Sequence, residues 1–324
     1  MGKERCIGID GCKAGWFFVS MGPGDESEFG VFENIEKLST AYTQAKWMLI
    51  DIPIGLPNKR IFTRACDKYA RKMLSPKRHN SIFSPPCREA LCAATYKEAC
   101  DINLTITGRK ISQQAFLFSK KIHEVDLLLK KNPNIAAKFR ESHPEICFWA
   151  LAGGMPMKNY KKTKAGLKER LDILKQYFPR SGAIYKAALD RYKRKEVARD
   201  DILDALALTV AASMLDEGGA SLPEKPEKDR LGLPMEIVYA IPESPIRVSE
   251  PSEQDVMIIN DLEPAGFDTV SRQISGHSTY AIVKAGDTTY LQIDTGCSSD
   301  DKRNQSIRFS PKAIKQLKAI IENL

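Results

Sequence analysis

Aspartate residues stand at the ends of three apolar segments, and this arrangement constrains the fold more than any other feature of the sequence. Asp10 closes one short apolar segment, Asp51 closes a second, and Asp201 and Asp204 open a third that is almost wholly apolar. Burying a carboxylate beside apolar residues costs free energy unless something compensates its charge. Because Asp201 and Asp204 are three residues apart, they share one helix face. The sequence therefore predicts a fold in which these acids meet at one compensated site.

The order of the predicted elements is typical of an α/β fold. Apolar stretches bounded by Gly and Pro predict strands at 5–10, 16–21, 28–32, 46–51 and 137–142, with a short helix at 34–45. The first three strands are close enough in sequence to form an antiparallel meander, and the fourth follows a helix and can pair parallel to the first. We expect a mixed five-stranded sheet flanked by helices.

Residues 1–243 are predicted to form the first domain. Its middle part, about 59–137, is mostly helical and basic, which indicates a helical insertion. A helix at 122–130 carries Glu124 and Asp126, and we expect both to be ordinary acids on the helix surface. A chain of 324 residues has room for this domain and a smaller second one.

The sequence changes character after the long apolar helix. Residues 217–230 combine Gly, Pro and charged residues and are interpreted as a connector, followed by a strand at 235–240. Residues 247–324 are predicted to form a small α+β domain of unknown role. It contains a hairpin at 280–294 and a closing helix that begins at Ser310, with Pro at the first helical position.

The apolar runs and the cysteines indicate a cytoplasmic protein. No apolar run is long enough to span a bilayer, so no membrane contact is expected, and the N-terminus lacks the apolar core of a secretory signal. Eight cysteines are scattered without a C-x-x-C pair, which is typical of reduced thiols. Cys87 and Cys92 could form half of a metal site, but no second pair has zinc spacing.

Positive charge is concentrated in a few stretches of a chain whose net charge is +8. The stretch 59–78 interleaves basic residues with Phe62 and Tyr69, and a second basic stretch spans 158–170. The candidate substrate-binding residues in these stretches are Arg64, Lys68, Arg71, Lys161 and Lys162. Such stretches suit binding to the phosphate backbone of DNA or RNA, although they are also common on plain solvated helix faces.

The acidic set favours a divalent metal. Three or four carboxylates are hard oxygen ligands that suit Mg²⁺ or Mn²⁺, and a bound cation would compensate their burial. A single Asp at a strand end is more often a cap or turn former, and Asp201 with Asp204 could be stabilised by the helix dipole alone. What favours a metal site is the complete set: two strands and one late helix. Asp200 is a possible substitute for Asp201 as the ligand.

Two segments resemble parts of RuvC-type resolvases. Residues 8–16, Gly-Ile-Asp-Gly-Cys-Lys-Ala-Gly-Trp, resemble the first hairpin of those enzymes. Residues 201–207, Asp-Ile-Leu-Asp-Ala-Leu-Ala, are similar to their last helix, where two acids three apart precede an Ala-Leu-Ala run. Resolvases usually carry Glu where this chain has Asp51, which is one methylene shorter.

A larger set of motifs gives a closer resemblance. These are Ile50-Asp51-Ile52-Pro53-Ile54-Gly55-Leu56-Pro57, Arg64-Ala65-Cys66-Asp67, Ser84-Pro85-Pro86, Lys121-Ile122-His123-Glu124-Val125-Asp126, His143-Pro144-Glu145 and Gly232-Leu233-Pro234-Met235. Over about residues 3–243 the chain is similar to an uncharacterised prokaryotic family of predicted RNase H-like nucleases, domain of unknown function 429. The resemblance implies an RNase H-like (ribonuclease H) fold, with Asp10, Asp51, Asp201 and Asp204 as catalytic metal ligands.

The expected activity is metal-dependent hydrolysis of phosphodiester bonds. Glu145 could be a further ligand, and His143 could orient a water or act as general base, although both could instead belong to a capped turn that opens a helix. Lys161 and Lys162 could hold a phosphate. One alternative function is a non-catalytic module that binds nucleic acid or protein. ATP-dependent phosphotransfer is less favoured, because residues 247–324 are too few for a second actin-like half. The choice among DNA, RNA and a small phosphorylated substrate stays open.

Overall fold

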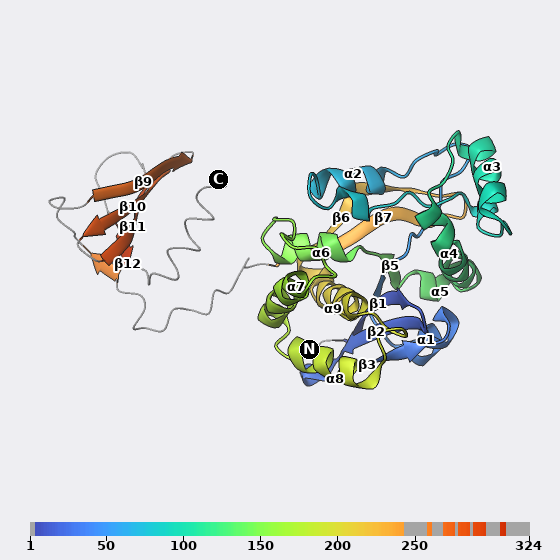
Figure 1. Cartoon of the computed structure of the whole chain (residues 1–324), viewed down its shortest axis with the longest axis horizontal. Helices are drawn as coiled ribbons and strands as arrows, with labels where there is room; N and C mark the ends of the chain where they lie inside the picture. Colours follow the sequence, from blue (N-terminus) through green and yellow to red (C-terminus); the bar gives the residue numbers. More distant parts are fainter. Residues whose placement is uncertain are drawn as a thin grey trace. The chain divides into compact units, whose positions relative to one another are not determined.

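The structure is a computed structural model that describes residues 4–242 and five strands between residues 258 and 308 (Figure 1). The chain divides into two compact units, residues 1–246 and 247–324. The helices of the first unit are α1 (Ile35–Ala41), α2 (Ala65–Met73), α3 (Tyr96–Thr107), α4 (Gln113–Lys131), α5 (Pro133–Ala136), α6 (Pro144–Leu151), α7 (Lys164–Tyr177), α8 (Ser181–Arg191), α9 (Arg199–Ser213) and α10 (Leu215–Gly218). Single 3-10 turns lie at Pro23–Asp25 (η1), His79–Ser81 (η2) and Arg88–Ala90 (η3).

The first unit contains the expected mixed five-stranded sheet. Its strands are β1 (Cys6–Cys12), β2 (Gly15–Met21), β3 (Ser27–Phe32), β4 (Trp47–Ile50) and β5 (Phe139–Glu141). They lie in the order β3-β2-β1-β4-β5. Strands β1, β2 and β3 form an antiparallel meander, and β4 pairs parallel to both β1 and β5. The predicted meander, the parallel pairing of the fourth strand with the first, and the mixed five-stranded sheet flanked by helices are confirmed.

Alternate residues of β1 supply two different cores. Ile7 and Ile9 face the layer that contains α1 and α4, where they pack with Ile35 and Ile122. Cys6 faces the opposite layer, which contains α6, α7 and α9. This alternation follows from the two-residue repeat of a strand. Helix α4 is therefore one of the covering layers of the sheet and not part of an insertion, which corrects the prediction for 59–137.

A glycine sets the closest approach between β1 and α9. A Cβ added at Gly8 would lie 2.2 Å from the carbonyl oxygen of Ala205. The backbone N–H of Gly8 donates a hydrogen bond of 3.1 Å to Oγ1 of Thr209. The two elements therefore touch backbone to backbone at this point, which fixes how the later part of β1 lies against the first turn of α9.

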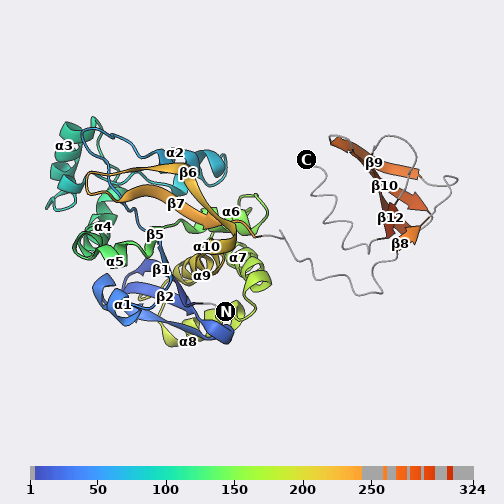
Figure 2. The same ribbon diagram turned by 180° about the vertical axis from the view of Figure 1, so that it is seen from behind.

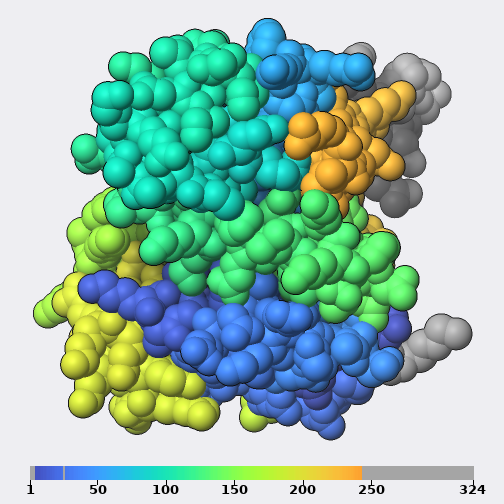
Figure 3. All heavy atoms as spheres, turned by 90° about the vertical axis from the view of Figure 1, so that its right-hand side faces the viewer, coloured from blue at the N-terminus to red at the C-terminus, as the bar shows by residue number. Residues whose placement is uncertain are grey.

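Residues predicted to be a connector form a strand instead. Strand β6 (Gly219–Lys228) pairs antiparallel with β7 (Pro234–Ala240), and α2 packs on both (Figures 2 and 3). In Figure 3 the blue atoms of α2 lie beside the orange atoms of this two-stranded sheet. A parallel bridge between Ser142 and Val238 joins β7 to the end of β5. The Gly, Pro and charged residues of β6 reflect an edge strand that is largely exposed on one side.

The described part of the second unit is a separate antiparallel sheet. Its strands are β8 (Ile258–Asn260), β9 (Asp268–Ser275), β10 (Ser278–Ala285), β11 (Thr288–Thr295) and β12 (Gln305–Arg308), in the order β8-β12-β11-β10-β9. Strands β10 and β11 are the predicted hairpin. The helix predicted from Ser310 lies outside the described residues. Across the described residues, no helix combines the length and apolar character that crossing a bilayer requires.

Candidate metal-binding active site

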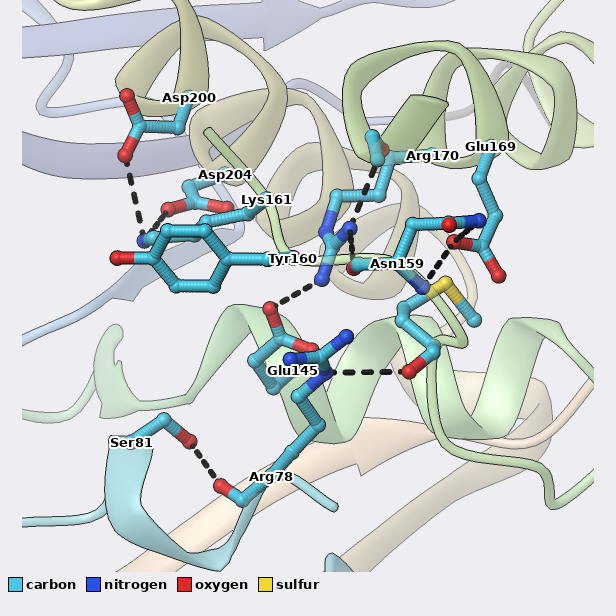
Figure 4. A network of polar contacts seen from close by, with 12 residues as sticks. Arg78, Ser81, Glu145, Asn159, Tyr160, Lys161, Glu169, Arg170, Asp200 and Asp204 are labelled. Carbon is cyan, nitrogen blue, oxygen red and sulfur yellow. Dashed lines mark hydrogen bonds and ion pairs between the residues drawn. The ribbon is translucent and has the colours of Figure 1, made fainter. Parts of the chain in front are cut away.

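A charged cleft of about 560 Å³ lies at the carboxyl ends of β1 and β4. Most of the predicted site residues line it: Asp10, Asp51, His143, Glu145, Lys161, Lys162, Asp200 and Asp201. Asp204 is 1% exposed and reaches the cleft through Lys161, which contacts both Asp204 and Asp200 (Figure 4). Acids from two strands and a late helix therefore meet in one place.

The packing of β1 against α9 brings the first carboxylates together. Asp10 lies two residues beyond Gly8, about 6.6 Å along the strand. Asp201 lies one helical turn before Ala205, about 5.4–6 Å along the axis. Because Gly8 touches Ala205, these two steps bring Asp10 level with the first turn of α9. Asp51 joins them because its backbone N–H donates to the carbonyl of Ile9 at 3.1 Å.

Two of these acids also serve the backbone. Oδ1 of Asp10 accepts a hydrogen bond of 2.7 Å from the N–H of Gly11. Oδ2 of Asp201 accepts one of 2.9 Å from the N–H of Ala198, just before α9. Each carboxylate keeps a second oxygen for the cleft. Asp200 also lines the cleft. Both candidates for this ligand position, Asp200 and Asp201, therefore face the site.

Lys161 places one positive charge among the acids. Its Nζ lies 2.5 Å from Oδ2 of Asp204 and 3.9 Å from Oδ2 of Asp200 (Figure 4). Burial by itself would lower the pKa of Lys161, but the carboxylates of Asp204 and Asp10 outweigh that effect and raise its pKa well above the ordinary value. The side chain is therefore a permanent ammonium at neutral pH.

Two buried carboxylate oxygens have no hydrogen-bond partner in the described part of the chain. They are Oδ1 of Asp204 and Oε2 of Glu145. The other oxygen of Glu145 accepts a hydrogen bond of 2.5 Å from the fully buried guanidinium of Arg170 (Figure 4). Leaving a buried charged oxygen unpartnered costs free energy. These two atoms are where an added cation would stabilise the site most.

The acids also raise the pKa values of one another. Burial is the largest cause, and it raises the pKa of Asp51, Asp201 and Asp204 to about 6 each. Burial, together with the charges of Asp201 and Asp51, raises the pKa of Asp10 well above its usual value. Shifts of this kind are typical of carboxylates that share one site with too little positive charge. A bound cation would reverse them.

His143 supplies a neutral ring to the cleft. Burial lowers the pKa of His143 to about 4, so the ring is uncharged at neutral pH. Its Nδ1 accepts a hydrogen bond of 3.2 Å from the N–H of Glu145, which caps α6. We assign the ring proton to Nε2 from this hydrogen bond. In this state His143 is a hydrogen-bond donor whose partner within the chain is the backbone of Ser81.

The donor set fits a hard divalent cation. It consists of carboxylate oxygens, and two of them are buried without partners. In the described part of the chain, the one group of three Cys, His, Asp or Glu side chains with ligand atoms within 4.8 Å of one another lies elsewhere, at Cys66, Asp67 and Glu141. No three of the described acids in the cleft meet this spacing, and Lys161 lies beside Asp204.

Arg64 compensates the Cys66, Asp67 and Glu141 group, and this corrects its predicted role in substrate binding. Its side chain is fully buried, donates a short hydrogen bond to Glu141, and lies 3.7 Å from Asp67. Glu141 also accepts from the backbone N–H of Ile54 at 2.6 Å. The guanidinium therefore ties β5 to the chain after β4, and it is not available to a nucleic-acid strand.

The other predicted basic residues lie in different places. Lys68 is exposed on α2 and is not part of the cleft wall. Arg71 donates to the carbonyl of Ile82 and to Oγ of Ser84, and lines a neighbouring pocket. Lys162 is exposed at the cleft rim. Lys77 and Arg78 also line the cleft, although they were predicted only as part of a basic stretch.

Two acids predicted on the surface of α4 have structural partners. Asp126 is buried and pairs with Arg88 at 2.7 Å, and Arg88 also contacts Asp229. Glu124 accepts hydrogen bonds from Nε1 of Trp16 and from the N–H of Ile35. Asp126 is therefore not a surface acid, and Glu124, which is partly buried, is held by partners from distant segments.

The Cys87 and Cys92 half-site is not formed as a pair. Cys87 is buried, whereas Cys92 is exposed and lies 3.5 Å from Nε2 of His123. Neither belongs to the group whose ligand atoms lie within 4.8 Å of one another.

The chain was compared with curated proteins, solved structures and protein-family models. No curated protein and no solved structure matches it. A family model matches residues 8–228, which is more than half of the chain and contains every acid of the cleft. The chain therefore belongs to the family described as protein of unknown function, DUF429.

Proposed function

We propose that the first unit is an RNase H-like nuclease that hydrolyses phosphodiester bonds with Mg²⁺ or Mn²⁺. The observation that carries the proposal is the acidic cleft, in which Oδ1 of Asp204 and Oε2 of Glu145 are buried without partners. The strand order β3-β2-β1-β4-β5, with acids at the ends of β1 and β4 and on α9, supports the RNase H-like assignment. The resemblance of residues 8–16 and 201–207 to resolvase segments is consistent with it.

The residues that would hold the metal are Asp10, Asp51, Asp201 and Asp204, with Glu145 beside them. Mg²⁺ or Mn²⁺ bound there supplies Lewis acidity and lowers the pKa of a coordinated water. Asp10, Asp204 and Glu145 are buried, which strengthens the attraction between these three carboxylates and a cation.

The other residues of the cleft are suited to a phosphate. Lys77 and Lys162 are exposed at the rim, where they attract a polyanion. Lys161 is a permanent cation deeper in the cleft and can neutralise charge on a phosphate oxygen. The Nε2–H of His143 would have to leave the backbone of Ser81 to reach a phosphate oxygen or a water. Asp10 and Asp201 can keep their hydrogen bonds to the backbone while these residues contact a phosphate.

A second candidate function is a non-catalytic module that binds nucleic acid. One observation favours it: the ammonium of Lys161 already lies 2.5 Å from Asp204 and compensates part of the acidic charge without a metal. Such a module would use the basic rim and would not need the acids for chemistry.

Cleavage assays separate the two candidates. The full chain is incubated with labelled single- and double-stranded DNA and RNA in Mg²⁺, in Mn²⁺ and in EDTA. We expect cleavage of at least one substrate, and only with metal. In Asp10→Asn/Asp204→Asn the rate of cleavage should fall by about 100-fold or more. The matched control is Asp172→Asn, which removes a half-exposed acid of a surface pair on α7.

Full metal-dependent cleavage by Asp10→Asn/Asp204→Asn would contradict the assigned ligands. Nucleic-acid binding by the wild type without any metal-dependent cleavage would favour the binding module.

A further inference from the structure

A second pocket of about 390 Å³ adjoins the acidic cleft. The two cavities share three lining residues, Asn80, Phe83 and Gln114. They come from η2, the loop that follows it, and the start of α4. The connection between α3 and α4, which includes Arg109 and Lys110, also lines the second pocket. The cleft therefore continues away from the acids into this basic pocket.

The two cavities differ in charge. Five carboxylates and four basic side chains line the acidic cleft, whereas the second pocket is lined by Arg71, Arg109 and Lys110 and by no Asp or Glu. Arg109 and Lys110 are exposed, and in the described part of the chain no ion pair engages either side chain. Negative charge on a ligand that extends from the acids into this pocket would be attracted by Arg109 and Lys110. Successive phosphates of a nucleic-acid strand carry such charge.

Aromatic side chains stand where the cavities join. Phe83 and Phe118 are stacked, with ring centroids 5.5 Å apart and an angle of 18° between the planes. Both line the acidic cleft, and Phe83 also lines the second pocket. Phe62, which is 55% exposed, lies at the second pocket. Phe62 is exposed, whereas Phe83 and Phe118 are half-buried and each has one face covered by the other ring. Aromatic side chains beside a basic groove are typical of sites that stack unpaired bases.

We propose that the two cavities form one path for a single strand of nucleic acid. The strand runs from the acids, across Phe83, to Arg109 and Lys110. Bases in a duplex are already stacked and paired, so they cannot use these aromatic faces without being unpaired. The inference deepens the proposed nuclease function by naming its substrate class, and the acidic cleft provides the point of cleavage only if that function holds.

Binding without metal tests the path separately from cleavage. Fluorescence anisotropy of the full chain in EDTA is measured with a labelled 12-nucleotide oligothymidine, an oligouridine of equal length, and a DNA duplex of the same length. We expect both single strands to bind more tightly than the duplex. In Arg109→Ala/Lys110→Ala, the affinity for the single strands should fall about tenfold or more. The slope of log affinity against log salt should fall by about 1.4, since two phosphate contacts are lost.

The matched control is Lys130→Ala/Lys131→Ala, which removes the same charge from two adjacent exposed residues. They lie at the other end of α4 from Gln114, about 25 Å along the helix axis. The control should bind within about twofold of the wild type. Phe83→Leu keeps an apolar side chain but removes the stacking face, and it should weaken single-strand binding without changing the salt slope.

Equal or tighter duplex binding would overturn the proposal, as would unchanged affinity in Arg109→Ala/Lys110→Ala. If the single strands bind as predicted but the chain does not cleave them with metal, the path is supported and the proposed nuclease activity is wrong. The two ideas therefore fail separately.

Discussion

The ammonium of Lys161 lies 2.5 Å from Oδ2 of Asp204, at the point where the acidic cleft meets the core. Asp204 is 1% exposed, and its other oxygen has no partner in the described part of the chain. The lysine thus satisfies half of a buried carboxylate and leaves the other half free. This contact makes Lys161 both a support for the metal-free protein and a competitor of an added cation.

Replacing Lys161 should separate these two effects. In Lys161→Met we expect the metal-free protein to lose about 1–3 kcal/mol of unfolding free energy, because Asp204 loses its partner. Mn²⁺ should bind about tenfold more tightly, because the competing charge is gone. Urea denaturation in EDTA measures the first effect and calorimetry the second. The control is Lys162→Met at the exposed neighbouring position. Weaker Mn²⁺ binding by Lys161→Met, with Lys162→Met unchanged, would mean that the lysine assists the metal.

The acids should give the metal-free protein a distinctive pH dependence. Burial raises the pKa of Asp201 from 3.8 to about 6. Between these values the folded chain binds more protons than the unfolded chain, so the unfolding free energy falls as pH rises from about 4 to about 6. Asp201→Asn removes one titrating group and keeps an oxygen for the N–H of Ala198. The fall should therefore be smaller in this variant.

Urea denaturation in EDTA across this pH range measures the effect, with Asp172→Asn as the control for a surface acid. If the unfolding free energy depends on pH equally in wild type and in Asp201→Asn, the pKa of Asp201 is not raised in the folded protein.

The contact between β1 and α9 should tolerate no side chain. In Gly8→Ala the new Cβ would meet the carbonyl of Ala205 at 2.2 Å, so α9 has to move. We expect a loss of about 2–4 kcal/mol of unfolding free energy, together with weaker Mn²⁺ binding, because Asp201 and Asp204 move with the helix.

Gly182→Ala on α8 is the control, because its Cβ would meet only the flexible end of Lys175. That change should be neutral or stabilise by about 0.5–1 kcal/mol. Thermal denaturation compares the two variants. A Gly8→Ala protein as stable as Gly182→Ala would mean that the helix adapts without cost.

The sequence predicted the sheet and the acid set because both depend on local patterns. Apolar strands bounded by Gly and Pro define the meander. An acid at the end of such a strand needs a compensating partner, because burying its charge alone costs free energy. Asp10 and Asp51 come directly after the paired residues Ile9 and Ile50, so their proximity follows once β1 and β4 pair. The run after Asp204 is apolar on all sides and therefore had to be a buried helix.

The roles that could not be predicted depend on partners far away in sequence. Arg64 stands in a basic stretch, yet its partner Glu141 is 77 residues away and makes the guanidinium an internal cation. Asp126 has the sequence setting of a surface acid and is instead buried with Arg88. Strand β6 has the composition of a connector because only its pairing with β7 makes it a strand. In each case tertiary pairing overrides the local pattern.

The most direct test of the central claim is a calorimetric Mn²⁺ titration of the full chain at neutral pH. Wild type is compared with Asp10→Asn/Asp204→Asn and with the surface control Asp172→Asn. We predict Mn²⁺ binding by the wild type and by Asp172→Asn, and its loss in Asp10→Asn/Asp204→Asn with the fold intact by circular dichroism. Absence of Mn²⁺ binding in the wild type, or equal binding by all three proteins, would contradict a metal site formed by these acids.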